Sequence, residues 1–328
     1  MFRLHDTRTG QAEVITPARP GELRVYACGP TVSRRAHAGD LRSALLPDLI
    51  RRSAERSRLT VIVSQSIADE GLTTPELAHR YEDAFRADCS ALNIRPPDHS
   101  PRASDSTGLE YLGEVIDIHT GDIDLRHGWD SAAVTATVES QPRYSNCPAR
   151  AGGTIAAGHP VTGHQVVRHW VHGGQLLFDG REMTASGPGV LLLSDVTDRG
   201  LDPLALRLAL LEHRYRQRVD LTWDMLRAAD ATLRQWRERV ADWAWSPSKP
   251  MCAQYVSDIV TAFDDDLDSP AALRALRGLE ADKQIPPGSA FETFAHVDRL
   301  LGLDLARDVG RPRAVTPPRA VTRPPDAR

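Results

Sequence analysis

The sequence predicts an α/β fold with a parallel sheet in its N-terminal part, followed by an all-helical region. A short strand at 23–27, an amphipathic helix at 41–57 and a β-branched strand at 59–63 follow one another closely. A strand, a crossover helix and a second strand form the unit that lays two strands parallel, and nucleotides bind at the carboxyl end of such strands. Later in the chain, apolar residues recur with helical spacing almost without a break. We therefore expect a Rossmann-like domain over 1–202 and a helical domain over 203–306.

Three local features modify this first unit. Cys28-Gly-Pro-Thr31 is predicted to be a turn, since glycine and proline favour turns. Pro47 lies inside the helix and is expected to kink it, because proline lacks an N–H and crowds the preceding turn. Residues 1–22 are polar and rich in turn-forming residues, so we expect no regular element there.

The remaining elements follow from the same patterns. A helix is expected over 75–92, ended by Pro96 and Pro97. Two strand segments are expected at 166–171 and 175–178, after a glycine-rich, poorly periodic stretch. The helices predicted for the C-terminal region are 203–216, 222–245, 251–266, 270–283 and 290–302.

The charge distribution argues against a nucleic-acid-binding surface. The 328 residues include 40 basic and 44 acidic side chains, which gives a net charge of −4. Residues 307–328 contain six arginines and two aspartates, so the rest of the chain is more acidic than the total suggests. No broad basic face is therefore expected. The same segment contains five prolines, and we expect it to be a disordered tail.

The sequence carries no sign of export or membrane insertion. No run of 18 apolar residues is present, which excludes a membrane-spanning helix, and the N-terminus lacks the apolar segment of a secretory signal. The four cysteines are far apart and do not suggest a disulfide framework. We expect a cytoplasmic protein with no membrane partner.

Seven segments along the chain carry more specific information. They are 25–32 (VYACGPTV), 36–44 (AHAGDLRSA), 81–92 with the following 96–103, 169–173 (HWVHG), 202–207 (DPLALR), 219–224 (VDLTWD) and 263–272 (FDDDLDSPAA). In this order they resemble the cysteinyl-tRNA synthetase family of class I aminoacyl-tRNA synthetases. The resemblance implies a Rossmann-like catalytic domain, a helical stem domain, and activation of cysteine by ATP to an adenylate before transfer to an acceptor.

The expected acceptor depends on the C-terminal region. The chain ends soon after Leu305, so we expect the anticodon-binding domain of full synthetases to be absent. The sequence is also similar to the mycothiol-pathway ligase, which lacks that domain and joins cysteine to an amino-sugar inositol. We therefore expect a small-molecule or carrier acceptor and no tRNA partner.

The His37-Ala-Gly-Asp40 segment lies where the family has its His-x-Gly-His signature. Free N–H groups and the positive dipole end of a helix favour phosphate at such a position. The resemblance implies that His37 donates to ATP phosphates and that Gly39 lets the nucleotide approach the backbone. Asp40 replaces the second His or Asn of the signature. It either faces the phosphates through Mg²⁺ or caps the helix, and both interpretations stay open.

The second signature of the family is Lys-Met-Ser-Lys-Ser, for which this chain has Arg-Glu-Met-Thr-Ala-Ser at 181–186. The candidate catalytic residues here are Arg181, Glu182, Met183 and Ser186. Glu182 and an alanine replace the two lysines that neutralise pyrophosphate charge in the family. No lysine occurs before residue 249, and arginine is not a free replacement at such a site. The sequence therefore predicts that ordinary adenylation is weak or absent.

The amino-acid site and the metal site of the family both involve the Cys28 segment. The resemblance implies that Cys28 and Thr31 contact the amino acid and that Gly29, Pro30 and Thr31 line the nucleotide site. The family holds Zn²⁺ beside the substrate thiolate, and the candidate ligands in this chain are Cys28, Cys147, His159 and His164. Their spacing fits no standard zinc pattern, so the alternative, cysteines in core or loop positions with exposed histidines, also stays open.

Three functions are compatible with these patterns. The first is a ligase that activates cysteine or a related amino acid with ATP and Mg²⁺ for a non-tRNA acceptor. The second is a catalytically weakened paralogue that binds nucleotide or has a regulatory role. The third, ranked last, is a genuine cysteine–tRNA ligase.

Overall fold

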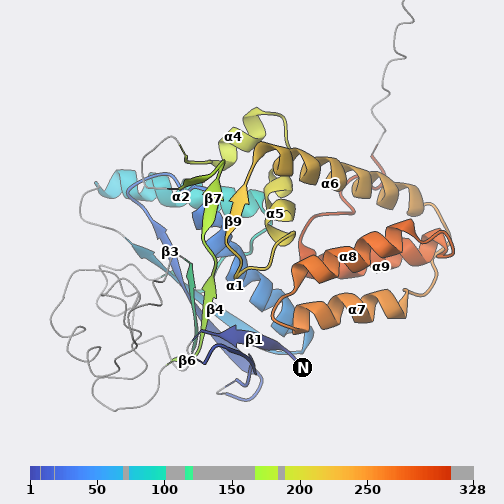
Figure 1. Ribbon diagram of the computed structural model, residues 1–328, viewed down its shortest axis with the longest axis horizontal. Coiled ribbons are helices and arrows are strands. Elements are labelled where there is room, and N and C mark those ends of the chain that lie inside the picture. The colour runs from blue at the N-terminus through green and yellow to red at the C-terminus, as the bar shows by residue number, and fades with distance from the viewer. Residues whose placement is uncertain are drawn as a thin grey trace, which may run out of the picture.

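The structure is a computed structural model, and it describes residues 1–7, 9–17, 19–68, 74–100, 115–120, 167–183 and 189–311. Figure 1 shows a sheet on one side and a group of helices on the other, with helix α1 between them. This helix, Ala38–Arg56, contacts both the sheet and the C-terminal helices. The predicted α/β architecture with additional helices is confirmed.

The main sheet has four strands in the order β4-β3-β5-β6, and every neighbouring pair is parallel. The strands are β3 (Glu22–Thr31), β4 (Thr60–Ala68), β5 (Val115–Thr120) and β6 (Val167–Gly173). In register, Val25 of β3 pairs with Val63 of β4 and Ile116 of β5. Helix α1 crosses from β3 to β4, so the predicted strand–helix–strand unit is confirmed.

One expectation for this unit is wrong, and the start of its helix differs from the predicted one. The segment from Cys28 to Thr31 is not a turn, because β3 continues through it with a shift in register against β4. A bulge of this kind accommodates glycine and proline at the end of a strand without ending the pairing. Helix α1 begins three residues before the predicted start and includes Pro47, and the kink expected there stays a prediction.

The N-terminal residues form an antiparallel hairpin that the sequence did not predict. Strands β1 (Arg3–Asp6) and β2 (Gln11–Val14) pair with each other. The N–H of Thr7 donates to the carbonyl of Trp170 in β6 at 2.8 Å, which brings the hairpin to this sheet edge. This region is mostly polar, whereas strands are recognised in a sequence from alternating apolar residues. The hairpin was therefore not predicted.

A second, smaller sheet extends the fold beyond β6. Its order is β8-β7-β9, formed by β7 (Leu176–Phe178), β8 (Arg181–Glu182) and β9 (Val219–Leu221). Strand β9 was not predicted. A short helix, α4 (Leu193–Asp198), follows β8 along the chain.

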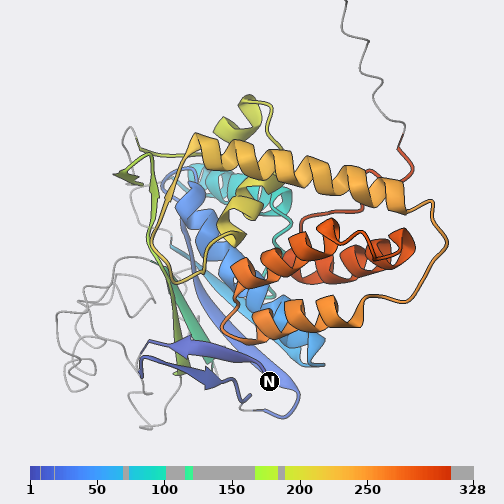
Figure 2. The same ribbon diagram turned by 45° about the vertical axis from the view of Figure 1, so that its right-hand side comes forward.

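The remaining helices agree closely with the sequence patterns, and Figure 2 shows α6 to α9 grouped beside α1. They are α2 (Pro75–Ala91), α5 (Pro203–Leu211), α6 (Trp223–Trp243), α7 (Ala253–Asp264), α8 (Ser269–Ala281) and α9 (Pro287–Leu301). Helix α5 ends earlier than expected. Among the described residues, no helix combines the length and apolar character needed to cross a membrane.

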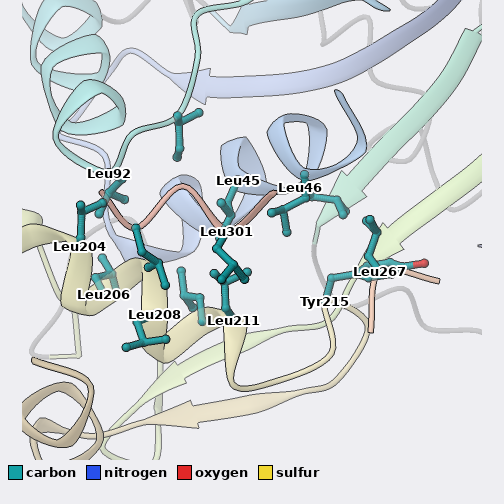
Figure 3. Packing of buried hydrophobic residues seen from close by; sticks show 14 of the residues in the cluster. Leu45, Leu46, Leu92, Leu204, Leu206, Leu208, Leu211, Tyr215, Leu267 and Leu301 are labelled. Atoms are coloured by element: carbon teal, nitrogen blue, oxygen red, sulfur yellow. The ribbon is translucent and has the colours of Figure 1, made fainter. Parts of the chain in front are cut away.

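One apolar core connects the sheet with the C-terminal helices. Figure 3 shows leucines from α1, α5 and α9 packed together, including Leu45, Leu208 and Leu301. Their side chains are almost completely buried. The core is therefore continuous across residue 202, where the sequence suggested a domain boundary.

A buried ion pair lies within this core. The Arg207 guanidinium of α5 donates to Asp48 Oδ2 of α1 at 2.9 Å and to the carbonyl of Leu301 at 2.6 Å. Both charged side chains are essentially inaccessible. Burial raises the pKa of Asp48, but the charges of Arg207 and Arg52 outweigh burial and hold that pKa below its ordinary value. The pair therefore stays ionised and links three helices.

Candidate active site

The N-terminus of α1 is closed by a reciprocal capping arrangement. His37 is the N-cap residue, and its Nδ1 atom accepts the N–H groups of Gly39 at 3.1 Å and Asp40 at 3.3 Å. In return, Asp40 Oδ2 accepts the N–H of His37 at 2.8 Å. Histidine here performs the role that serine or threonine usually has in a capping box. The capping interpretation of Asp40 thus agrees with the geometry.

The hydrogen bonds of His37 define its protonation state. Burial lowers the pKa of His37 below 6.5, although the nearby Asp40 charge opposes this effect. Nδ1 also lies 3.2 Å from Asp40 Oδ2, but two backbone donors already point at it, so we assign it as an acceptor. A neutral imidazole that accepts at Nδ1 carries its proton on Nε2. His37 can therefore donate from Nε2 to a ligand without carrying a charge.

The charge of Asp40 is already balanced within the loop. Arg34 donates to both carboxylate oxygens of Asp40, at 2.7 and 3.2 Å. Both side chains remain partly exposed. This bidentate ion pair offsets the repulsion that a free carboxylate would exert on a phosphate.

The first-turn amides of α1 are not free, which differs from the expectation for a phosphate-binding helix end. The N–H of Ala38 donates to the carbonyl of Leu191 at 2.8 Å, and the next two N–H groups donate to His37. The N–H of Leu41 donates to the His37 carbonyl. The capping side chain and a neighbouring loop thus occupy the donors that the sequence suggested for ATP.

Gly39 has a structural role within the cap, whereas its predicted role in nucleotide binding stays a prediction. A Cβ atom at this position would lie 2.9 Å from Cε1 of His37 and 3.0 Å from its Nδ1. Real Cβ atoms essentially never show such a distance. Glycine is therefore needed so that the imidazole can fold over the helix end.

The second signature segment leads into a stretch of chain that contacts this helix end. Arg181 and Glu182 are exposed in β8, and Met183 packs partly buried against the core, whereas Ser186 lies outside the described residues. A Cβ atom on Gly189 would lie 2.9 Å from Cβ of Arg181, so the chain returns close to β8. It then reaches Leu191, whose carbonyl accepts the Ala38 N–H. The stretch at 189–191 therefore connects the two segments that the resemblance singled out, since it contacts Arg181 at one end and Ala38 at the other.

Arg42 is a positioning residue that the sequence analysis missed. Its buried guanidinium donates to five carbonyl oxygens, of Gly174, Gln175, Arg214, Tyr215 and Gln217. These carbonyls belong to the two residues between β6 and β7 and to the loop before β9. Burial lowers the pKa of Arg42 to about 10, so the side chain stays charged at neutral pH. In the sequence, the available signal for a buried arginine was its position next to apolar residues of the helix predicted at 41–57.

The amino-acid and zinc assignments remain predictions. Cys28 lies in the bulged end of β3, but its side chain and that of Thr31 are outside the described residues. Gly29 is half-buried and Pro30 buried at the same strand end. The other candidate ligands, Cys147, His159 and His164, also lie outside the described part of the chain.

Comparisons with known proteins show which proteins this chain resembles. A family model described as the class I (C) tRNA synthetase catalytic domain matches residues 14–108. The chain is similar to a cysteine–tRNA ligase of Opitutus terrae, with 26% identity over 430 aligned positions that cover 93% of this chain and 86% of the ligase. Because 430 positions exceed the 328 residues present here, the ligase contains residues with no counterpart in this chain.

Two further similarities extend the comparison. L-cysteine:1D-myo-inositol 2-amino-2-deoxy-alpha-D-glucopyranoside ligase of Streptomyces griseus is 26% identical over 400 positions, which cover 93% of this chain and 96% of that ligase. Methionyl-tRNA synthetase of Mycobacterium tuberculosis, solved with methionyl-adenylate, superposes with a TM-score of 0.50 at 13% identity. This superposition covers 86% of this chain and 90% of the synthetase. It supports the fold alone.

Proposed function

Because the predicted relationship to the cysteinyl-tRNA synthetase family is confirmed, we propose that this chain uses ATP to activate cysteine or a related amino acid and transfers it to an acceptor other than tRNA. The observation that supports the proposal is the Ala38–Leu191 hydrogen bond, because it holds the stretch that follows the second signature segment against the first signature segment. This hydrogen bond lies near the carboxyl end of β3, where parallel α/β sheets bind their ligands.

The chemistry assigned to the site is a two-step transfer. A carboxylate oxygen of the amino acid attacks the α-phosphorus of ATP, and pyrophosphate leaves; Mg²⁺, when bound, would neutralise part of the phosphate charge. A nucleophile of the acceptor then attacks the carbonyl carbon of the aminoacyl adenylate, and AMP leaves. His37 donates from Nε2 to a phosphate oxygen, while Arg181 is the described cation of the second segment. Preorganised donors of this kind stabilise developing negative charge.

The acceptor class is supported by the relative from Streptomyces griseus. That protein is named as a ligase of cysteine and an amino sugar, and the similarity covers nearly all of it. We therefore propose a small-molecule or carrier-bound acceptor with an amine nucleophile.

A weakened paralogue that binds nucleotide in a regulatory role is the second candidate. Two observations favour it: the first-turn amides of α1 are occupied within the chain, and no lysine precedes residue 249. Without such cations, stabilisation of pyrophosphate falls to arginines, which differ from lysine in shape and hydration. A genuine cysteine–tRNA ligase ranks third, supported by the names of the matched ligases.

The decisive experiment is amino-acid-dependent exchange of pyrophosphate into ATP, measured with Mg²⁺ and Zn²⁺ for each amino acid. We expect exchange with cysteine or one related amino acid, lost in His37→Ala and kept in His79→Ala, whose side chain is exposed on α2. No exchange by a sample that melts cooperatively would refute the ligase. ATP binding without exchange would support the paralogue instead.

A further inference from the structure

Two carboxylates and an imidazole converge where the N-terminal hairpin meets the sheet edge. Asp6 ends β1, Glu13 lies in β2 and His169 lies in β6. One ligand atom from each lies within 4.8 Å of the other two. The side chain of Asp6 is fully buried, whereas those of His169 and Glu13 are 12% and 34% exposed. The cluster is thus enclosed but reachable from solvent.

The distances within this cluster suit ligands of one metal ion. His169 Nδ1 lies 3.8 Å from Asp6 Oδ2 and 3.6 Å from Glu13 Oε2, longer than ordinary hydrogen bonds. Nitrogen and oxygen ligands at roughly 2.1 Å from a tetrahedral ion are about 3.4 Å apart. A small inward movement therefore places all three atoms around one ion.

A neighbouring hydroxyl orients one of these ligands. Thr9 Oγ1 donates to Glu13 Oε1 at 2.6 Å, and the other oxygen, Oε2, is the one nearest His169. Outer hydrogen bonds of this type fix the direction of metal-binding carboxylates. The Thr7–Trp170 backbone hydrogen bond independently holds the hairpin against β6.

We propose that Asp6, Glu13 and His169 bind one divalent transition-metal ion, with Zn²⁺ as the best match. One imidazole and two carboxylates suit zinc better than calcium or magnesium, which prefer oxygen ligands alone. The ion joins hairpin β1–β2 to strand β6 and leaves one position for water. These ligands are separate from the predicted set that contains Cys28. His169 also precedes the end of β6 at Gly173 by four residues, a distance of about 13 Å along the strand.

The hairpin connects this site to the C-terminal helices. Asp266, which follows α7, accepts the N–H of His5 at 2.8 Å, and its own N–H donates to the carbonyl of Arg3. An ion bound to Asp6 therefore stabilises both contacts of the hairpin, one with the sheet and one with the helices. Its role is structural.

The test is zinc titration by calorimetry on metal-free, full-length protein carrying Cys28→Ser and Cys147→Ser, which removes candidate thiolate ligands. We expect about one Zn²⁺ to bind per chain and to raise the melting temperature. Glu13→Gln and His169→Gln should each weaken zinc affinity by more than about tenfold, since changes in the residues around the ligands alone lower metal affinity about 10–100-fold. The matched variants Glu238→Gln and His79→Gln, both at exposed positions, should bind like the parent.

A second measurement keeps the proposal testable if His169→Gln folds poorly. The parent protein for this measurement carries Cys28→Ser and Cys147→Ser. Co²⁺ bound to it should give the visible absorption spectrum of a site with nitrogen and oxygen ligands, and Glu13→Gln should alter that spectrum. Absence of zinc binding in the double-cysteine background would overturn the proposal. Binding that is indifferent to both Glu13→Gln and His169→Gln would overturn it as well, and would leave the cluster as direct contacts among the three side chains.

Discussion

At the scale of single residues, His37 and Gly39 form one unit. The imidazole caps α1 only because residue 39 has no side chain, and the cap in turn determines which nitrogen carries the proton. The same glycine would look like a nucleotide-binding glycine in the sequence. The structure shows that its nearest constraint is the histidine two residues earlier.

Replacing Gly39 by alanine should therefore displace His37. We expect a loss of about 1 kcal/mol in the free energy of unfolding, the usual value of an N-cap, and at least tenfold slower pyrophosphate exchange. Gly278→Ala is the control, because its Cβ would meet Tyr255 at an ordinary 3.4 Å and alanine is favoured inside a helix. Denaturant unfolding and exchange rates measure both effects. Unchanged exchange in Gly39→Ala would contradict the role given to His37.

His172 is a second residue whose surroundings have a measurable consequence. Its Nδ1 lies 2.7 Å from Thr7 Oγ1, and burial, assisted by the charge of His5, lowers its pKa to about 4. In the unfolded chain the value is 6.5. Below that pH the unfolded state binds a proton more readily than the folded state, so stability falls as the pH falls from 6.5 towards 4.

The free energy of unfolding should thus decrease between pH 7 and pH 4.5 by about 2 kcal/mol more in the wild type than in His172→Asn. Asparagine keeps a polar contact with Thr7 but does not titrate. Urea unfolding at the two pH values measures the difference. Equal losses in both proteins would show that His172 does not contribute to acid sensitivity.

At the scale of elements, Arg42 explains how α1 is held in register with the segments around it. Five carbonyl groups converge on one guanidinium, and a Cβ atom at Gly174 would lie 2.4 Å from the Gln217 carbonyl oxygen. The strands and loops here approach so closely that carbonyl oxygens face each other. A buried cation with several donors compensates for that arrangement.

Arg42→Lys should lower the free energy of unfolding by about 3 kcal/mol, since an ammonium group has too few donors for five carbonyls and each charged hydrogen bond contributes about 1.5–3 kcal/mol. The exposed Arg80→Lys on α2 should change stability by less than about 0.5 kcal/mol. Chemical denaturation of the two variants provides the comparison. A similarly small change in the free energy of unfolding of both variants would mean that the five carbonyl groups find other hydrogen-bond donors.

At the scale of the whole molecule, the buried pair Arg207–Asp48 joins the two parts of the sequence. It connects α1, the helix of the strand–helix–strand unit, with α5 and with the end of α9. Gly302 has a φ of 65°, and a Cβ atom there would lie 2.6 Å from Arg207 Nη2. The C-terminal helices are thus built around this arginine, which agrees with the continuous core.

Arg207→Met should cost about 3–5 kcal/mol in unfolding free energy, because it leaves a buried carboxylate without its main partner. The exposed pair of Arg227 and Asp224 offers the control, and Arg227→Met should cost less than about 1 kcal/mol. Thermal and denaturant unfolding should remain a single transition in the wild type. Separate transitions for the two halves of the chain would contradict the shared core.

The sequence alone determined the larger elements of this protein, because periodicity and helix-capping residues act locally. The parallel unit built from β3, α1 and β4 and the C-terminal helices followed from apolar spacing. The hairpin β1–β2 and strands β5 and β9 did not, since short polar or isolated strands depend on partners far away in the sequence.

Only the tertiary structure decided how the candidate site is arranged. The sequence predicted that His37, Gly39 and Arg181 share a site, but it suggested free amides where the fold brings Leu191 to occupy one and His37 to occupy two others. Donor and acceptor pairing at a helix end depends on which distant carbonyl approaches it. That approach is set by packing of the whole chain, which no local pattern encodes.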